Sequence, residues 1–315
     1  MLTETEWHNF PAWTLEDEAI AVTFLPQKGG KICSLIDKRK RREWLIGPGN
    51  RPLKPVPYGA VFTQQEMCGW DEMFPTIDAC RIASSGMLKR VLLPDHGEVW
   101  TMEWDVEEGT ENSFRLGVDG KAFPYHLCRQ ARLTRRGGLE LAYTVTNMGT
   151  VPFPYLWTAH PQFACTEETV IDLPANVVSV YNAMDMPQWG PRGTIYPWPN
   201  ATRLDGQPQA LNRIRSANFQ ECHKFYVLPD VIVSWAMLTD LSADARLLLE
   251  WNAPIRYLGI LVDEGVFNPE AVAALEPSTG FYDDLERAYQ SGRATILKPR
   301  ETHTWQITLS FGGEN

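Results

Sequence analysis

The sequence predicts an all-β protein, built as a large antiparallel β-sandwich with a few short helices. In many short segments apolar residues alternate with polar ones, and clusters of Gly, Pro, Asn and Asp separate these segments. An alternation with period two places the apolar side chains on one face of a strand, and sheets bury such faces by packing against each other. Helical periodicity is rare, so a Rossmann or TIM-barrel architecture, which needs crossover helices, is not expected.

Four segments show the alternation most clearly, and we expect a strand in each: 100–106, 139–145, 231–237 and 305–311. Two short segments favour a helix. Residues 282–290 carry acidic residues in the first turn and are followed by Gly292, as is typical of helix ends. Residues 269–274 form a second, shorter helical candidate.

The length of 315 residues exceeds that of most globular domains, but large sandwiches often reach it with a single core. We therefore expect one domain over residues 1–315. Residues 184–209 are rich in Pro, Gly, Trp and Asn and predict a long excursion over the surface. Long loops of this kind are often functional, and this one could be a lid, an oligomer contact or decoration.

The charge and cysteine content exclude several classes of protein. The formal net charge of −10 argues against nucleic-acid binding, and the basic run at 38–42 is expected to be a solvated turn. No signal peptide is recognisable, and no apolar run approaches the roughly 20 residues that span a bilayer. The six cysteines form no CxxC pair, so we expect reduced thiols, no zinc site and a cytoplasmic location.

Two side chains have a context that suits acid–base chemistry. His160 lies in an aromatic-rich segment and precedes a proline, which favours an extended backbone, and histidine exchanges protons near neutrality. Glu276 lies between an apolar stretch and a Pro/Gly turn, where partial burial would raise its pKa. His96 lies at a turn that enters a strand, a common position for binding residues. A structural histidine and a surface acid are the alternatives for the first two, and the other four histidines are expected to be structural or exposed.

Several blocks of the sequence resemble, in the same order, the aldose 1-epimerase-like (galactose mutarotase-like) superfamily. They are an opening hairpin at 25–35, the segment 69–75 (Gly-Trp-Asp-Glu-Met-Phe-Pro), Asp95-His96-Gly97, a turn at 147–149 that leads to 152–163, the Glu-Pro block at 275–279, and the turn at 297–301. The resemblance extends from about residue 20 to residue 312.

The resemblance implies a sandwich with a concave sugar cleft, no metal and no organic cofactor. It implies that Glu276 is the catalytic base and His160 the acid that open and close a monosaccharide ring. His96 would then contact the substrate, with further candidate contacts from Trp70, Asp71, Glu72, Trp157 and Lys224. The expected partners are a monosaccharide, neither nucleic acid nor membrane, and at most a second copy of the chain.

The sequence also departs from the superfamily. The Arg of the classical galactose mutarotases has no counterpart in 64–66 or 70–72, the binding aspartate cannot be assigned, and Leu261 replaces a Trp of many relatives. Two alternatives therefore remain open. One is a non-catalytic sugar-binding or sensor protein. The other is an enzyme for a sugar phosphate, for which Arg81, Arg90 and Lys224 are the candidate phosphate ligands.

Overall fold

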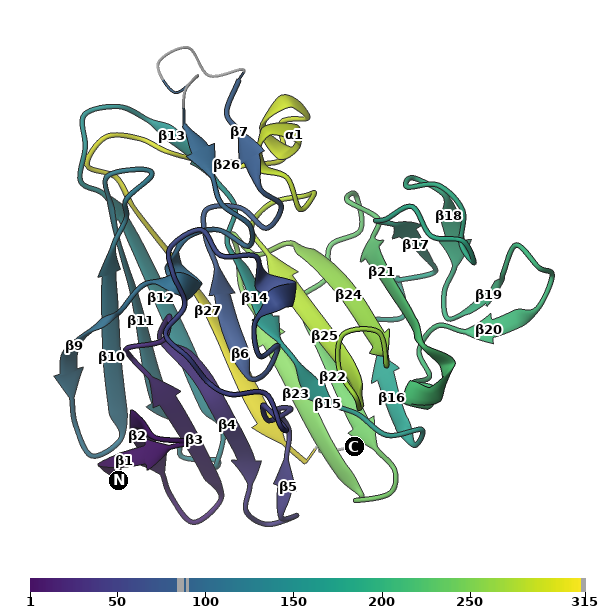
Figure 1. Ribbon diagram of the computed structural model, residues 1–315, viewed down its shortest axis with the longest axis horizontal. Helices are drawn as coiled ribbons and strands as arrows, with labels where there is room; N and C mark the ends of the chain where they lie inside the picture. The colour runs from purple at the N-terminus through teal and green to yellow at the C-terminus, as the bar shows by residue number, and fades with distance from the viewer. Residues whose placement is uncertain (84–87, 89–90, 313–315) are drawn as a thin grey trace.

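Two large antiparallel sheets stacked face to face form the body of the protein. The computed structural model describes residues 1–83, 88 and 91–312. In Figure 1 the strands of the two sheets run across the body, and β17 to β20 form a lobe that projects at the right. The expected all-β sandwich is confirmed, and no helix among the described residues is long and apolar enough to cross a membrane.

The larger sheet has 13 strands and begins at the N-terminus. Along its main path the strands are β1 (Leu2–Trp7), β2 (Phe10–Glu16), β3 (Ile20–Leu25), β4 (Lys31–Asp37), β6 (Trp70–Met73), β14 (Thr158–Pro161), β25 (Ala271–Ser278), β24 (Tyr257–Glu264), β21 (Glu221–Val227), β17 (Ser179–Asn182) and β18 (Ile195–Pro197). Two short strands lie off this path, β5 (Arg42–Glu43) beside β4 and β15 (Phe163–Ala164) beside β25.

The second sheet has eight strands. Its order is β16 (Thr169–Asp172), β22 (Trp235–Asp240), β23 (Ala245–Trp251), β27 (Thr302–Phe311), β12 (Leu139–Asn147), β11 (Tyr125–Leu133), β10 (Ser113–Asp119) and β9 (Asp105–Gly109). Three two-stranded sheets complete the fold: β13 (Phe153–Tyr155) with β26 (Thr295–Leu297), β19 (Asn200–Thr202) with β20 (Pro208–Ala210), and β7 (Cys80–Arg81) with β8 (Leu92–Leu93).

The main hydrophobic core lies between the two large sheets. In β12 the burial alternates strictly, so that Leu139, Leu141, Tyr143 and Val145 point inward. The neighbouring β27 places Trp305, Ile307 and Leu309 beside them. Each such side chain contributes about 1.5–3 kcal/mol by leaving water, which fixes the register because a one-residue slip would expose the whole row.

The expected strands at 139–145 and 305–311 are confirmed, and the helix expected at 282–290 is present as α1 (Leu285–Gln290), which starts at the N-cap Asp284. The strand expected at 231–237 begins only at Trp235. Two expectations were wrong. Residues 99–101 form a 3₁₀ turn, and β9 begins only at Asp105. The indole of Trp100 donates a hydrogen bond to the carbonyl oxygen of Asp95, and that of Trp104 donates one to the carbonyl oxygen of Val99.

The second wrong expectation is the helix at 269–274, where β25 runs from Ala271 to Ser278. All eight side chains of β25 are buried, because the strand lies in the middle of the larger sheet and both of its faces are covered. A continuous apolar run of this length fits a buried strand as well as a helix, so the sequence period could not distinguish them.

The lobe has a small core of its own, which includes Trp189, Tyr196 and Phe225. His223 of β21 packs against this core, with its ring centroid 5.4 Å from that of Phe225. Burial lowers the pKa of His223 to about 3, and its Nδ1 has no hydrogen-bond partner among the described residues. The imidazole is therefore neutral in the folded protein at neutral pH.

Replacing His223 with Leu is expected to make the fold more resistant to acid. Between pH 6.5 and about 3 the unfolded state binds a proton at this histidine and the folded state does not, so stability is lost as the pH falls through this window. The full effect is on the order of 5 kcal/mol. Calorimetric Tm values at pH 7 and pH 4.5 should drop less in His223→Leu than in the parent. The exposed His8→Leu is the matched control, and an unchanged drop in His223→Leu would contradict the prediction.

Candidate functional site

His160, Glu276 and Lys224 lie on one face of the larger sheet. They belong to β14, β25 and β21, respectively. The pairing of Thr158 with Ser278 puts His160 level with Glu276 on adjacent strands, and side chains level across a sheet share a face. His160 Nε2 is 3.6 Å from Glu276 Oε1, and Lys224 Nζ is 2.7 Å from Glu276 Oε2.

A glycine lets the Glu276 carboxylate reach Lys224 although β24 runs between their strands. Gly259 of β24 pairs with Glu276, and a Cβ at this glycine would lie 2.9 Å from Glu276 Oε2. Any larger residue would push the carboxylate aside. The missing side chain therefore creates the space in which the ion pair forms.

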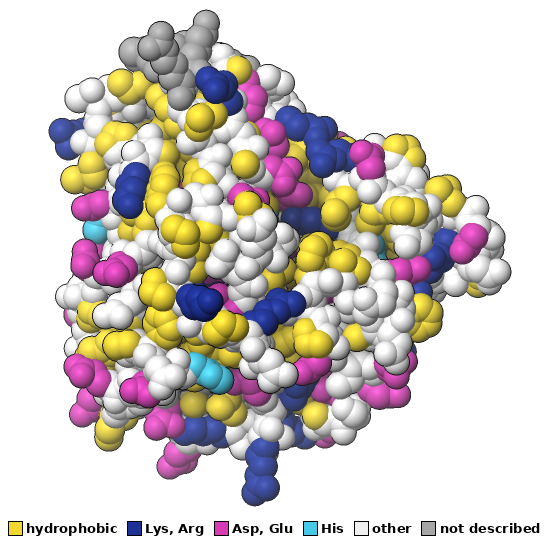
Figure 2. Space-filling model, in the orientation of Figure 1, with side chains coloured by type: hydrophobic (Ala, Val, Ile, Leu, Met, Phe, Trp, Pro, Cys, Tyr) yellow, Lys and Arg dark blue, Asp and Glu magenta, His cyan; other side chains and the backbone are white. Residues whose placement is uncertain are grey.

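A cavity of about 410 Å³ opens above this face, within the usual range for small-molecule sites. His160 and Lys224 line it, whereas Glu276 lies directly beneath them and is fully buried. In Figure 2 charged side chains of both signs gather where the lobe meets the body. The other lining residues are Phe62, Thr63, Met67, Ile77, Asp78, His96, Gln162, Met184, Asp185, Arg192, Cys222, Leu261, Asp263, Phe267, Asn268, Val272 and Asp283.

His96 reaches the same cavity from a loop, and Asp95 fixes its ring. His96 Nδ1 is 3.0 Å from Asp95 Oδ1, while the other carboxylate oxygen accepts a hydrogen bond of 2.7 Å from the backbone N–H of Phe62. The Phe62 ring stacks on the His96 imidazole with centroids 4.2 Å apart. The His160 ring packs edge-on against the same His96 imidazole, with centroids 5.5 Å apart. Because Nδ1 is engaged by Asp95, Nε2 is the ring nitrogen of His96 that remains for a ligand.

The Glu276 carboxylate is buried with neither oxygen in a hydrogen bond to the described residues. Lys224 approaches one oxygen closely enough for an ion pair, but without hydrogen-bond geometry. Burial raises the pKa of Glu276, and the ammonium of Lys224 offsets part of that rise. A buried carboxylate with free acceptor capacity is suited to accept a proton or a hydroxyl hydrogen bond from a ligand.

Lys224 also contacts Asp283, at 2.8 Å from its Oδ1, and Tyr226 donates a hydrogen bond to the same oxygen. Burial opposes the charge on Lys224, but Asp283 and Glu276 outweigh burial and raise its pKa. Burial likewise opposes the charge on Asp283, yet Lys224 and the Tyr226 hydroxyl lower the pKa of that carboxyl. The ammonium is therefore shared between two carboxylates and stays protonated.

His160 is held as a neutral imidazole. Burial, followed by the nearby His96 and Lys224, lowers its pKa well below the usual value, and its Nδ1 has no partner among the described residues. A neutral imidazole has one N–H donor and one acceptor nitrogen. At 3.6 Å, the contact of His160 Nε2 with Glu276 is too long for a hydrogen bond, so Nε2 is not tied to the carboxylate.

Asp71, a predicted substrate contact, lies next to His160 in β6 but is engaged elsewhere. It pairs with Lys31, which also bonds the carbonyl oxygen of Cys68. Lys31 Nζ is in turn 3.6 Å from Glu66 Oε1. Asp71 does not line the cavity, and it belongs to a buried ionic cluster beside His160.

Three other predicted contacts point into the core between the sheets. Glu72 accepts hydrogen bonds from Arg129 (2.9 Å), Tyr143 (2.8 Å) and the indole of Trp157 (3.0 Å). The indole of Trp70 is also fully buried in the core. None of the three lines the cavity. Alternation along β6 explains the outcome, since Trp70 and Glu72 face the core when Asp71 faces the other way.

The structure brings Glu276, His160, His96 and Lys224 together, as the sequence analysis expected for one site. Five further residues belong to the site and were not selected in the sequence analysis. Asp95 contacts His96, and the other four line the cavity: Phe62, Gln162, Asn268 and Asp283. Asp283 was assigned to a helix terminus, and no spacing in the sequence connects it to Lys224. Of the two other candidate phosphate ligands, Arg81 is exposed in β7 and does not line the cavity, and Arg90 lies outside the described residues.

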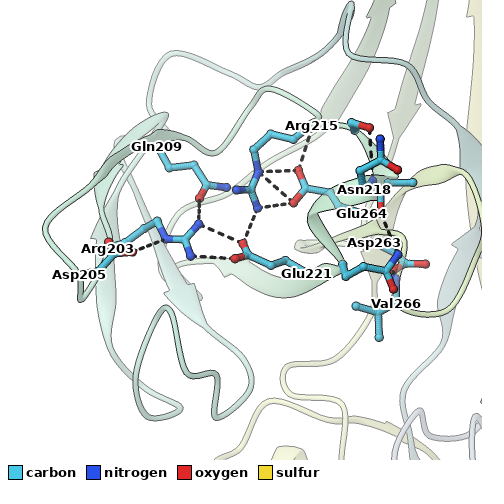
Figure 3. A network of polar contacts seen from close by, with 12 residues as sticks. Arg203, Asp205, Gln209, Arg215, Asn218, Glu221, Asp263, Glu264 and Val266 are labelled. Atoms are coloured by element: carbon cyan, nitrogen blue, oxygen red, sulfur yellow. Dashed lines mark hydrogen bonds and ion pairs between the residues drawn. The ribbon is translucent and has the colours of Figure 1, made fainter.

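The expected surface excursion borders the cavity through Met184, Asp185 and Arg192. An ionic network fastens the lobe to the sheet (Figure 3). Arg203 Nη2 is 2.8 Å from Glu221 Oε1, and Arg215 bonds both Glu221 and the fully buried Glu264. These contacts join the loops of the lobe to β21 and β24, the strands that carry the cavity floor.

Comparison with known structures defines the fold as galactose mutarotase-like. A galactose mutarotase-like protein from Lactobacillus casei is 17% identical with a TM-score of 0.70, over 96% of this chain and 100% of that chain. One from Clostridium acetobutylicum is 15% identical with a TM-score of 0.70, over 100% and 99%. The Slr1438 protein of Synechocystis is 18% identical with a TM-score of 0.72, over 99% and 98%.

The sequence itself matches the aldose 1-epimerase family model over residues 89–244. The resemblance to the aldose 1-epimerase-like superfamily is therefore confirmed, by the family model for the central segment and by the fold for the whole chain. No curated protein matches the sequence.

Proposed function

We propose that the protein is a mutarotase that interconverts the α and β anomers of a free monosaccharide. The observation that carries the proposal is the Glu276 carboxylate, buried beside two cavity-lining histidines, with one oxygen in an ion pair with Lys224 and neither oxygen in a hydrogen bond to the described residues. The match to the aldose 1-epimerase family, an isomerase family, supports it.

In the proposed reaction Glu276 removes the proton from the anomeric hydroxyl. The freed electron pair forms the C1 carbonyl, the bond from C1 to the ring oxygen breaks, and that oxygen takes a proton from the protein. Rotation about the C1–C2 bond presents the other carbonyl face, and the reverse transfers close the ring. Both oxygens are bonded to C1, so the base and the acid must lie close together, as Glu276 and His160 do.

His160 and His96 have different roles near the ring oxygen. The neutral His160 gives its N–H proton to the ring oxygen, and the proton that Glu276 has accepted restores the imidazole to its neutral form, so that neither group keeps a changed charge. His96, backed by the Asp95 carboxylate, contacts the substrate beside it. When the anomeric hydroxyl takes the place of Lys224 at the Glu276 carboxylate, Lys224 remains bound to Asp283.

The charges around the cavity favour an unphosphorylated substrate. Four aspartates line the cavity: Asp78, Asp185, Asp263 and Asp283. Lys224 is already held by two carboxylates, which leaves Arg192 as the only other lining cation of the described residues. A phosphoryl group needs converging Arg or Lys side chains to balance its charge, and this rim is acidic instead.

The test is the rate of anomer interconversion, by polarimetry or NMR saturation exchange, for a panel of free and phosphorylated aldoses. We expect acceleration for at least one free aldose and none for the corresponding phosphates. Saturable sugar binding without acceleration would overturn the mutarotase proposal and favour a sugar sensor. Acceleration restricted to phosphates would overturn the proposed substrate class.

Asp95→Asn is expected to lower kcat roughly 10–100-fold, because it removes the charge that orients and supports His96. KM should change little, since Asp95 does not line the cavity. The exposed Asp230→Asn is the matched control. The rate of anomer interconversion is measured for both variants. A kcat of Asp95→Asn at the parental level would show that Asp95 has no part in the reaction.

A further inference from the structure

A cluster of metal-ligating side chains lies on the second sheet, away from the cavity. It consists of Glu107 of β9 with His126 and Cys128 of β11, and the possible ligand atoms all lie within 4.8 Å of one another. The neighbours of Cys128 in β11, Leu127 and Arg129, point into the core, so the cluster occupies the outer face of the sandwich.

Two local features bring Glu107 across β10 to the residues of β11. The register of β9 on β10 shifts between Arg115 and Leu116, which leaves Glu107 as the extra residue of a bulge, a feature that re-aims a side chain. Gly117 of β10 pairs with Cys128, and a Cβ there would lie 2.0 Å from Glu107 Oε1. The glycine thus provides the space that the carboxylate occupies.

The distances suit a small divalent transition-metal ion. Glu107 Oε1 is 2.7 Å from His126 Nε2 and 3.6 Å from Cys128 Sγ. Tetrahedral zinc with ordinary bond lengths separates such ligand atoms by about 3.3–3.7 Å, so the separation of Glu107 Oε1 from Cys128 Sγ already fits, and that from His126 Nε2 would have to widen. His126 and Glu107 are partly exposed, which leaves a path for entry and for water as a fourth ligand.

The surroundings of the cluster match those of a metal-binding histidine. His126 Nδ1 is 2.7 Å from Asp119 Oδ1, and a carboxylate on the far nitrogen commonly orients an imidazole whose other nitrogen binds a metal. Arg115 competes for Glu107, but at Oε2 (2.6 Å), which leaves Oε1 available. With Cys128 as thiolate, the cluster would carry three negative charges, on Glu107, Asp119 and Cys128. Arg115 balances one of them, and a dication would balance the other two.

We propose that Glu107, His126 and Cys128 form a binding site for one thiophilic divalent ion, of the class of Zn²⁺ or Co²⁺. The ion displaces two protons to solvent, that of the Cys128 thiol and that on His126 Nε2, and forms a metal–sulfur and a metal–nitrogen bond.

The experiment is a Co²⁺ titration of the reduced full-length protein, followed by displacement with Zn²⁺. We expect one ion per chain and a thiolate-to-cobalt charge-transfer band that disappears in Cys128→Ser. Asp119→Asn, which removes no ligand, should weaken binding roughly 10–100-fold, and it remains informative if Cys128→Ser folds poorly. Cys222→Ser is the matched thiol control and should retain the band.

Absence of the band, or its persistence in Cys128→Ser, would overturn the proposal. Zn²⁺ binding that is equally tight in the parent and in Asp119→Asn would show an adventitious surface ion and overturn it as well. Neither result affects the proposed mutarotase activity, because the cluster lies on the other sheet and shares no residue with the cavity.

Discussion

Glu276→Gln is expected to lower kcat by about 10²–10⁴-fold while leaving the fold intact, because the amide matches the carboxylate in shape but cannot accept the anomeric proton. The fold should tolerate the change, since Lys224 keeps Asp283 as its partner. In the parent protein, burial raises the pKa of Glu276, so activity should fall on the acid side at a higher pH than an exposed glutamate would give. NMR saturation exchange measures kcat and its pH profile directly.

The matched control for Glu276→Gln is Glu250→Gln, an exposed glutamate of β23. It should retain parental kinetics and Tm. Parental activity in Glu276→Gln would rule out Glu276 as the base. A low Tm accompanied by lost activity would indicate a structural role instead, and thermal melts of both variants distinguish these outcomes.

Arg129→Met is expected to destabilise the protein by about 3–5 kcal/mol, the usual cost of leaving one member of a buried ion pair uncompensated. Arg129 Nη1 is 2.9 Å from Glu72 Oε1, and both side chains are inaccessible to solvent between the sheets. The guanidinium also lies over the rings of Phe24 and Trp104. Its loss leaves Glu72 with only neutral donors, from Tyr143 and Trp157.

The pair is tested by adding Glu72→Gln to Arg129→Met, which removes the stranded charge and should recover much of the lost stability. In the single variant, burial keeps the folded-state pKa of Glu72 above its unfolded value. The variant should therefore be most destabilised at neutral pH and less so as the pH falls toward the ordinary range of a glutamate. Thermal melts at several pH values measure both effects. A single variant as stable as the parent would contradict the prediction.

The period of two in the sequence was sufficient for the architecture. β12 and β27 bury alternate side chains as the pattern predicts, because in a half-buried strand the sequence records which face meets the core. The pattern gave the wrong element for β25, whose eight side chains are all buried. It also gave a strand at Trp100, which lies in a 3₁₀ turn with its indole hydrogen-bonded to a backbone carbonyl. In both places the burial is set by neighbours distant in the chain.

The sequence alone determined the fold class, the family resemblance and four residues that the structure gathers at one site: Glu276, His160, His96 and Lys224. The tertiary structure decided which polar residues of the site face the cavity. Asp71 and Glu72 are adjacent in the chain, yet one joins the Lys31 cluster and the other pairs with Arg129 in the core. The packing of the loop after β25 brings Asp283 to Lys224, and the pairing of β9, β10 and β11 brings Glu107 to Cys128, and no local pattern encodes such encounters.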